Sequence, residues 1–248
     1  MKRVWFVTFF GLFAAVAPAQ YTTLDRIQQR GVITIGVDPN NLPFSSATNQ
    51  PPGFDIEIAQ KIAERMGVKF KPVWVRSQHP SYPAQLMKKR CDALIGVAPK
   101  AMADEKGMLF TKPYYGTGFL PAVRANGQPS NGLVGVEAGI VSEELKGLAP
   151  REYRSQAAIL AAVREGELAT GYVGAVQGGW LLKTNPGWGI EMKTASTPAD
   201  TWNVVIAVRK DSPELKAALD KSIQQLLDAN EIEPILRKYG IPFYPPFP

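Results

Sequence analysis

Residues 32–66, VITIGVDPNNLPFSSATNQPPGFDIEIAQKIAERM, decide the fold. The first six residues are apolar and mostly β-branched, which predicts a buried strand over 32–37. A loop rich in Pro, Asn and Ser follows, over 38–49. After Gly53, apolar residues recur at helical spacing up to Met66, and Asp55 is expected to cap that helix. The stretch therefore reads as the strand, loop and helix that begin a βαβ unit.

The same alternation continues on the C-terminal side. Further strands are expected over 69–75 and 93–98, with a short helix over 84–89 between them, and this order indicates a parallel α/β sheet. A second, smaller unit is expected from strands over 133–137 and 167–173, with a helix from Ser155 to Arg164 between them. Pro213 marks the first turn of a long helix near the C-terminus.

Two extended segments, near 119–124 and 200–207, join the two predicted units. We expect them to form a hinge between lobe 1 (residues 20–121 and 204–248) and lobe 2 (residues 122–203). In open α/β sheets, ligands bind outside the carboxyl ends of the strands. The cleft between the lobes is therefore the expected binding site.

The N-terminus has the pattern of a secretory signal peptide over residues 1–19. Lys2 and Arg3 precede an apolar run that ends at Ala17, and Ala17-Pro18-Ala19 supplies small residues for cleavage. The run is too short to cross a bilayer, which needs about 20 residues. The mature chain is therefore expected in the periplasm and is not expected to span the membrane.

Composition narrows the function classes. The 248 residues include one Cys and one His, so the chain cannot supply the four Cys or His ligands of a usual structural zinc site or form an internal disulfide. The net charge is +6, but no basic run exceeds Lys88-Lys89-Arg90, so nucleic acid is not an expected partner. Motifs for a nucleophile elbow, a His-based triad or a P-loop are missing. We therefore expect neither an enzyme nor a bound cofactor.

Several ordered motifs resemble the family 3 periplasmic solute-binding proteins, the two-lobed receptors of amino-acid ABC transporters. They are Val37-Asp38-Pro39 with Pro43-Phe44 and Gly53-Phe54-Asp55, Cys91-Asp92-Ala93-Leu94-Ile95-Gly96, and Phe110-Thr111-Lys112-Pro113-Tyr114-Tyr115. The resemblance covers essentially the whole mature chain. It implies an α/β fold, the two-lobed type II periplasmic binding protein with a hinge of two extended segments.

The amino-acid clamp of that family is missing. Where the family has an Arg for the ligand's α-carboxylate, this sequence has Asp104, and Ala101 replaces the Thr of the same segment. The hydroxyl of the second lobe is replaced by Ile140, and the Asp for the α-ammonium falls near Gly174. A carboxylate without its bidentate Arg loses its main charge-assisted bonds. We therefore expect no binding of free α-amino acids.

One subfamily resembles this chain more closely. The segment Asp38-Pro39-Asn40-Asn41-Leu42-Pro43-Phe44-Ser45 is similar to the signature of the MxaJ/XoxJ-type proteins, and the C-terminal Tyr239-Gly240-Ile241-Pro242 is similar too. That subfamily implies an accessory role beside a quinoprotein (PQQ-dependent) alcohol or methanol dehydrogenase and its cytochrome c. A protein partner, the quinone and a small organic solute all stay open as occupants of the cleft. The alternative is an ABC-transporter receptor that delivers a small polar solute to a permease.

The candidate ligand-binding residues lie at the expected carboxyl ends of strands or in the segments of the resemblance. The amides of Asn40 and Asn41 could equally serve turn chemistry, and the aromatic rings could equally be core. Arg76 is the cation that could enter the cleft. Cys91 is expected to be a buried, unreactive thiol and His79 a solvated loop residue. The full set is Asp38, Asn40, Asn41, Phe44, Trp74, Arg76, Tyr115, Tyr172 and Trp180.

Overall fold

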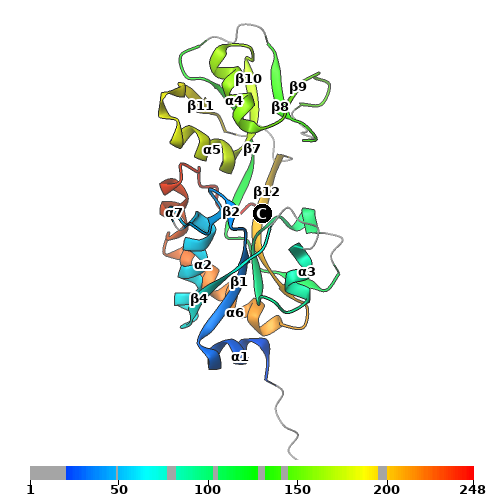
Figure 1. The fold of residues 1–248 in the computed structure, drawn as a ribbon, viewed down its shortest axis with the longest axis vertical. Coiled ribbons are helices and arrows are strands. Elements are labelled where there is room, and N and C mark those ends of the chain that lie inside the picture. The colour runs from blue at the N-terminus through cyan, green and yellow to red at the C-terminus, as the bar shows by residue number, and fades with distance from the viewer. Residues whose placement is uncertain are drawn as a thin grey trace, which may run out of the picture.

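A computed structural model describes residues 21–48, 50–76, 82–102, 106–127, 132–140, 145–194 and 200–248. The predicted signal peptide lies outside the described residues. The chain forms two α/β lobes stacked along the long axis (Figure 1), which confirms the expected fold class. In the described part of the chain, no helix is long and apolar enough to cross a membrane.

Lobe 1, the lower body in Figure 1, is built on a parallel three-stranded core. Its strands are β1 (Val32–Val37), β4 (Lys69–Trp74) and β5 (Ala93–Val97), with the short β2 (Asn40–Asn41), β3 (Ser45–Ser46) and β6 (Met108–Phe110). Its helices are α1 (Thr23–Arg30), α2 (Phe54–Arg65), α3 (Tyr82–Met87), the 3-10 turn at Pro99–Met102, α6 (Pro213–Asp228) and α7 (Ile232–Lys238). The predicted elements of residues 32–66 are all present.

Lobe 2 is smaller. Its strands are β8 (Val134–Glu137), β9 (Arg151–Tyr153), β10 (Thr170–Gly174) and β11 (Ile190–Met192). Its helices are α4 (Gln156–Glu165), α5 (Ala175–Thr184) and a 3-10 turn at Pro186–Trp188. Strand β8 pairs in parallel with both β9 and β10, so the predicted second unit is also present.

Two long strands join the lobes: β7 (Tyr115–Arg124) and β12 (Thr201–Arg209). Residues 115–118 of β7 pair with β12, and residues 119–122 of the same strand pair with β10 of lobe 2. The partner of β7 therefore changes between Gly118 and Phe119. The two extended segments of the predicted hinge are these strands, while the lobe boundaries at 121/122 and 203/204 stay predictions.

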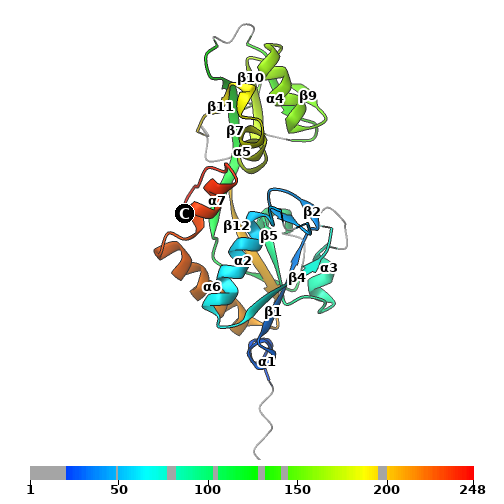
Figure 2. The same ribbon diagram turned by 60° about the vertical axis from the view of Figure 1, so that its left-hand side comes forward.

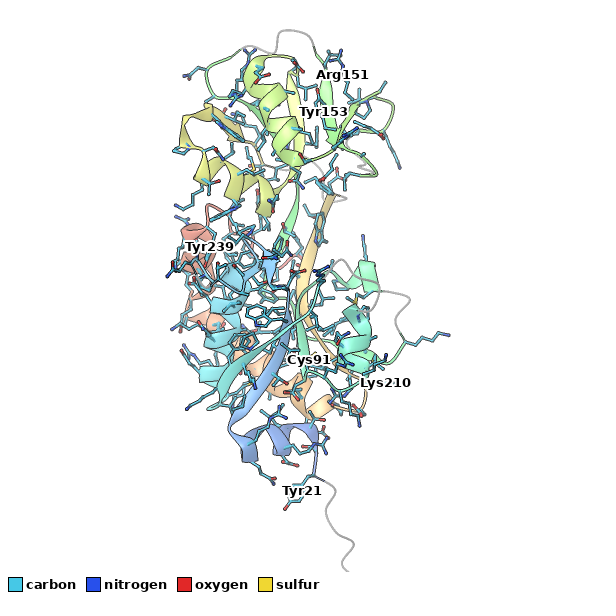
Figure 3. All side chains as sticks on the ribbon, viewed as in Figure 1. Tyr21, Cys91, Arg151, Tyr153, Lys210 and Tyr239 are labelled. Carbon is cyan, nitrogen blue, oxygen red and sulfur yellow. The ribbon has the colours of Figure 1, made fainter. Side chains whose placement is uncertain are left out.

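The hydrophobic cores are separate. The main core of lobe 1 packs α2, α6 and α7 against β1 and β5, with side chains such as Ile35, Ile62 and Leu219 fully buried. Cys91 is buried in a second cluster on lobe 1 (Figure 3). Burial raises the pKa of its thiol to about 11. In lobe 2, Ile159 and Val163 of α4 pack on the sheet.

One local prediction is wrong. Asp55 does not cap α2, because the cap position is Gly53, which has a φ of 100° and provides no side-chain bond. A Cβ at Gly53 would lie 2.4 Å from the carbonyl oxygen of Phe44, so only glycine fits there. Asp55 instead points into the protein and is 3% exposed.

Helix α5 is an element that the sequence analysis did not predict. Gly178 and Gly179 lie inside it, and each glycine costs a helix about 1 kcal/mol relative to alanine. The glycines permit close packing: a Cβ at Gly179 would lie 2.4 Å from the carbonyl oxygen of Gly240. Trp180 of α5 also packs against Tyr239, with ring centroids 5.9 Å apart. Figures 2 and 3 show α5 meeting the end of α7 at this junction of the two lobes.

Candidate functional site

A cavity of about 660 Å³ lies between the lobes. This volume is in the range of ordinary small-molecule sites. Lobe 1, the two hinge strands and lobe 2 all contribute to its walls. The lining residues are Asn40, Asn41, Leu42, Phe44, Gly96, Ala98, Tyr115, Thr117, Phe119, Glu137, Ile140, Ser155, Gln156, Ala157, Gly174, Val176, Gln177, Leu181, Trp202 and Val204.

The lobe 1 wall is a small hairpin after β1. The carboxylate of Asp38 accepts a hydrogen bond from the backbone amide of Asn40 at 2.9 Å, which closes a turn. The hydroxyl of Ser45 donates to the Asp38 carbonyl at 2.7 Å, and β2 pairs with β3. This hairpin places Asn40 and Asn41 at the edge of the cavity, with Asn41 partly buried.

Aromatic rings line the inner part of the cavity. The Phe44 ring lies 5.2 Å from that of Phe54, which in turn meets Tyr115 edge-on at 5.8 Å. On the hinge strands, Phe119 and Trp202 pack with centroids 5.3 Å apart. Tyr115 is 1% exposed, and its hydroxyl has no hydrogen-bond partner. A buried hydroxyl without a partner among the described residues is rare.

The lobe 2 wall is organised by one glutamine. The side-chain amide of Gln156, at the start of α4, donates to the Glu137 carboxylate at 3.2 Å. The side-chain oxygen of Gln156 accepts the Gly174 backbone amide at 2.9 Å. Glu137 is partly buried and takes part in none of the ion pairs of the described residues. The carboxylate therefore faces the cavity beside an amide whose orientation is fixed.

A smaller cavity of about 260 Å³ adjoins the first, with Asn41, Phe44, Gly96 and Ala98 shared by both linings. Asp38 and Asp55 line it. The Tyr114 hydroxyl donates to Asp55 at 2.8 Å and accepts the Gly96 amide at 3.2 Å. Burial raises the pKa of Asp55 to about 7, against the opposing effect of the Tyr114 hydrogen bond.

The charges of these two cavities have one sign. Their described lining includes the carboxyl groups of Glu137, Asp38 and Asp55 but no Lys, Arg or His, although the chain carries a net charge of +6. Within the described residues, no three His, Cys, Asp or Glu side chains are grouped as a metal site. The site therefore offers carboxylates, amides and aromatic faces, but no group that would hold an anion by charge.

Residues 33–242 match the family model of the bacterial extracellular solute-binding proteins, family 3. The chain belongs to this family. The match covers both lobes and the hinge strands, and it agrees with the position of the cavity at the carboxyl ends of β1 and β5.

Known relatives include proteins of more than one kind. Protein MoxJ of Methylorubrum extorquens is 27% identical over 251 residues, which cover 80% of each chain. The cyclohexadienyl dehydratase of Pseudomonas aeruginosa is 30% identical over 112 residues, 44% of this chain and 41% of the dehydratase. Among solved structures, the unliganded open L-cystine receptor of Neisseria gonorrhoeae superposes with a TM-score of 0.73 at 18% identity, covering 88% of this chain and 96% of the receptor. That likeness shows the fold alone.

Two of the positions where this family holds an amino acid face the cavity. Ile140 and Gly174 both line it, and neither has a side-chain hydrogen-bonding group. Asp104, at the position of the carboxylate-binding Arg, lies outside the described residues. The absence of an amino-acid clamp stays a prediction, to which the structure adds the lack of any cation in the described lining.

The structure places the nine candidate residues in different environments. Asn40, Asn41, Phe44 and Tyr115 line the main cavity, and Asp38 lines the smaller one. Trp74 ends β4 and Arg76 lies two residues beyond it; both are exposed, and neither lines these cavities. Tyr172 lies on β10, and Trp180 packs on Tyr239 at the lobe junction. Ligand contact stays a prediction for all nine. Four of them are absent from the lining of both cavities: Trp74, Arg76, Tyr172 and Trp180.

Glu137, Gln156 and Phe119 were not among the candidates. Glu137 could have been found, because it ends the predicted strand over 133–137 and the rule of carboxyl ends applies to lobe 2 as it does to lobe 1. Gln156 follows the predicted cap Ser155 and thus begins a helix. Their mutual bond has no signal in the sequence, because nineteen positions separate them.

Proposed function

We propose that this protein is a periplasmic accessory of a PQQ-dependent alcohol dehydrogenase system. In this proposal its interlobe cleft binds a segment of the dehydrogenase or of its cytochrome c, or a small ligand of that system. The subfamily resemblance and the similarity to Protein MoxJ over 80% of both chains support this role. The predicted signal peptide supports the location.

The observation that carries the proposal is a family cavity whose described lining offers no cation for an amino acid's carboxylate. Amino-acid receptors need a cation for the α-carboxylate, and the described lining has none while Glu137 would repel that group. The protein thus retains the two lobes and the cleft of a receptor but is unsuited to the usual cargo.

An exposed tryptophan beside the cleft supports docking of a protein. Trp74 is 42% exposed and pairs in register with Val37, at the same carboxyl edge of the sheet that borders the cavity. Exposed Trp side chains are enriched among residues that dominate binding energy at interfaces.

The alternative function is that of an ABC-transporter receptor for a small polar solute other than an α-amino acid. The observation that favours it is the cavity itself, with polar groups from both lobes, among them Asn41 and Gln156, around one volume. Under this alternative the partner is a permease.

Neither function includes catalysis. The dehydratase relative keeps the question open, because it has an enzyme's name and aligns over 44% of this chain. The described cavity lining contains carboxyl groups but no partner base or nucleophile arranged with them.

The test is a surface-binding titration of the mature protein against the quinoprotein dehydrogenase of the same organism. We expect the wild type to bind and Trp74→Ala to weaken binding by about 2 kcal/mol, the usual threshold of a hot spot. Met87→Ala is the matched control and should leave binding unchanged, since Met87 is 40% exposed on the same lobe. Cys91→Ser should also leave binding unchanged, because Cys91 is buried in the core. Failure of the wild type to bind, together with stabilisation by a solute, would replace the accessory role with the receptor role.

A further inference from the structure

The cleft has an unbalanced charge that the fold does not need. Glu137 accepts a single hydrogen bond, from the neutral Gln156, and it has no cationic partner in the described part of the chain. A partly buried carboxylate usually has a charged or multiply hydrogen-bonded partner. Glu137 therefore has remaining capacity to accept a donor that enters the cavity.

Some of the backbone N–H groups that could bind an anion at this wall already donate to side chains of the protein. Ser155 caps α4 by accepting the Ala158 amide at 3.3 Å, and Gln156 takes the Gly174 amide at the start of α5. Through its bond to Gln156 the Glu137 carboxylate lies near the N-terminus of α4, where the partial positive charge of the helix dipole stabilises it but supplies no paired cation. A carboxylate or phosphate at this wall would meet Glu137 first.

The opposite side of the cavity suits an organic cation rather than a bare ion. Phe119 and Trp202 present a pair of aromatic rings on the hinge, and Phe44 adds a third ring. Aromatic faces attract alkylammonium groups through the ring quadrupole while covering their carbon atoms.

We propose that the interlobe cleft binds a monovalent organic cation without a carboxylate, with its charge on Glu137 and its apolar part against Phe119 and Trp202. The cation is either a free alkylammonium solute or the side chain of a Lys or Arg on a docked protein segment. This inference rests on the proposed role of the cleft as a binding site, and it defines the chemistry of the occupant.

The experiment is calorimetric titration of the mature protein with pairs of probes that differ in charge. The 2-phenylethylammonium ion is compared with its uncharged counterpart 2-phenylethanol as the free solute. A blocked peptide with one lysine is compared with its norleucine counterpart as the tethered source, and acetate is the anion. We expect the cation of one source to bind at least about tenfold more tightly than its neutral counterpart, as a charge-assisted bond allows.

The variant Glu137→Gln keeps an acceptor for Gln156 but removes the charge. We expect it to abolish the preference for the cation. Glu152→Gln is the matched control, because Glu152 is exposed on β9, next to β8, and lies outside the cavity lining. This variant should keep the preference within about twofold, as surface changes usually do.

The outcomes separate this inference from the accessory role. Equal binding of charged and neutral probes, tighter binding of acetate, no binding of either cation, or a preference that survives Glu137→Gln would each overturn the inference. If the dehydrogenase still binds in those cases, the accessory role stands. If a cation binds through Glu137 but the dehydrogenase does not, the inference stands and the receptor role replaces the accessory role.

Discussion

Asp55 of lobe 1 and Glu137 of lobe 2 are two carboxyl groups at the border of the cleft, in opposite environments. Asp55 of lobe 1 is 3% exposed, accepts the Tyr114 hydroxyl and has a pKa raised to about 7 by burial. Glu137 of lobe 2 is only partly buried and touches one neutral amide. The first group joins α2 to Tyr114, just before β7, and through it to the Gly96 amide of β5, while the second is hydrogen-bonded to Gln156 alone among the described residues.

The contrast suggests different roles for the two carboxyl groups: Asp55 serves the fold, and Glu137 serves the binding site. A buried network such as Asp55, Tyr114 and the Gly96 amide fixes the position of the lobe 1 wall, because each member satisfies the next. Glu137 belongs to no such network among the described residues, which fits the proposed role of its carboxylate in binding a ligand. Variants of the two groups should therefore change different measurements.

The largest expected effect concerns Asp55 and pH. Its folded pKa of about 7 lies above the usual value of 3.8, so the folded state holds the proton more tightly than the unfolded state between these values. The free energy of unfolding should therefore decrease as the pH rises from 4 to 7, and by roughly 3 kcal/mol between pH 5 and pH 8.

Asp55→Asn should remove that decrease, since the amide is neutral throughout and can still accept from Tyr114. Urea unfolding at pH 5 and pH 8, for the wild type and the variant, measures it. Equal pH dependence in the two proteins would show that Asp55 is ionised in the fold and that its burial has been overestimated.

The next effect compares two adjacent tyrosines. Tyr114→Phe removes the hydroxyl that bonds Asp55 and the Gly96 amide, so it should lower the free energy of unfolding by about 2 kcal/mol. Tyr115→Phe removes a hydroxyl without a partner and should change stability by less than about 0.5 kcal/mol. Denaturant unfolding of both variants is the measurement, and equal losses would contradict the assigned hydrogen bonds.

The smallest effect is expected for Glu137 in the absence of ligand. Glu137→Gln should change the free energy of unfolding by less than about 0.5 kcal/mol, because the carboxylate has no ion pair and the Gln156 bond can be kept. Thermal unfolding of the ligand-free variant checks this. A loss comparable to that of Tyr114→Phe would mean that Glu137 serves the fold and would weaken the case for a ligand.

Much of the fold is predictable because it is encoded locally. The strand at 32–37 matches the structure residue for residue, since its apolar, mostly β-branched residues and the loop that ends it are adjacent in the sequence. Helix α5 is not predictable in this way, because Gly178 and Gly179 lower its helix propensity and their reason is the distant Gly240.

The site is less predictable than the fold. The rule that ligands bind at the carboxyl ends of strands correctly indicates that Asn40, Asn41 and Phe44 border the cavity. The rule does not distinguish Asp55 from a helix cap, because its burial depends on Tyr114 of a separate strand. Nor does it reveal the bond between Glu137 and Gln156, which arises when β8, α4 and β10 pack together.

The most direct test of the account is whether the cleft prefers a cation that lacks a carboxylate. Calorimetry would compare amino acids with the amines formed by their decarboxylation, such as L-phenylalanine with 2-phenylethylamine and L-leucine with 3-methylbutylamine. The charges around the cavity predict that, within these pairs, the amine binds at least about tenfold more tightly and that no amino acid reaches a Kd below ~10 µM. Tighter binding of the amino acids would contradict the account, because it would require a carboxylate-binding group that the cavity lining does not contain among its described residues.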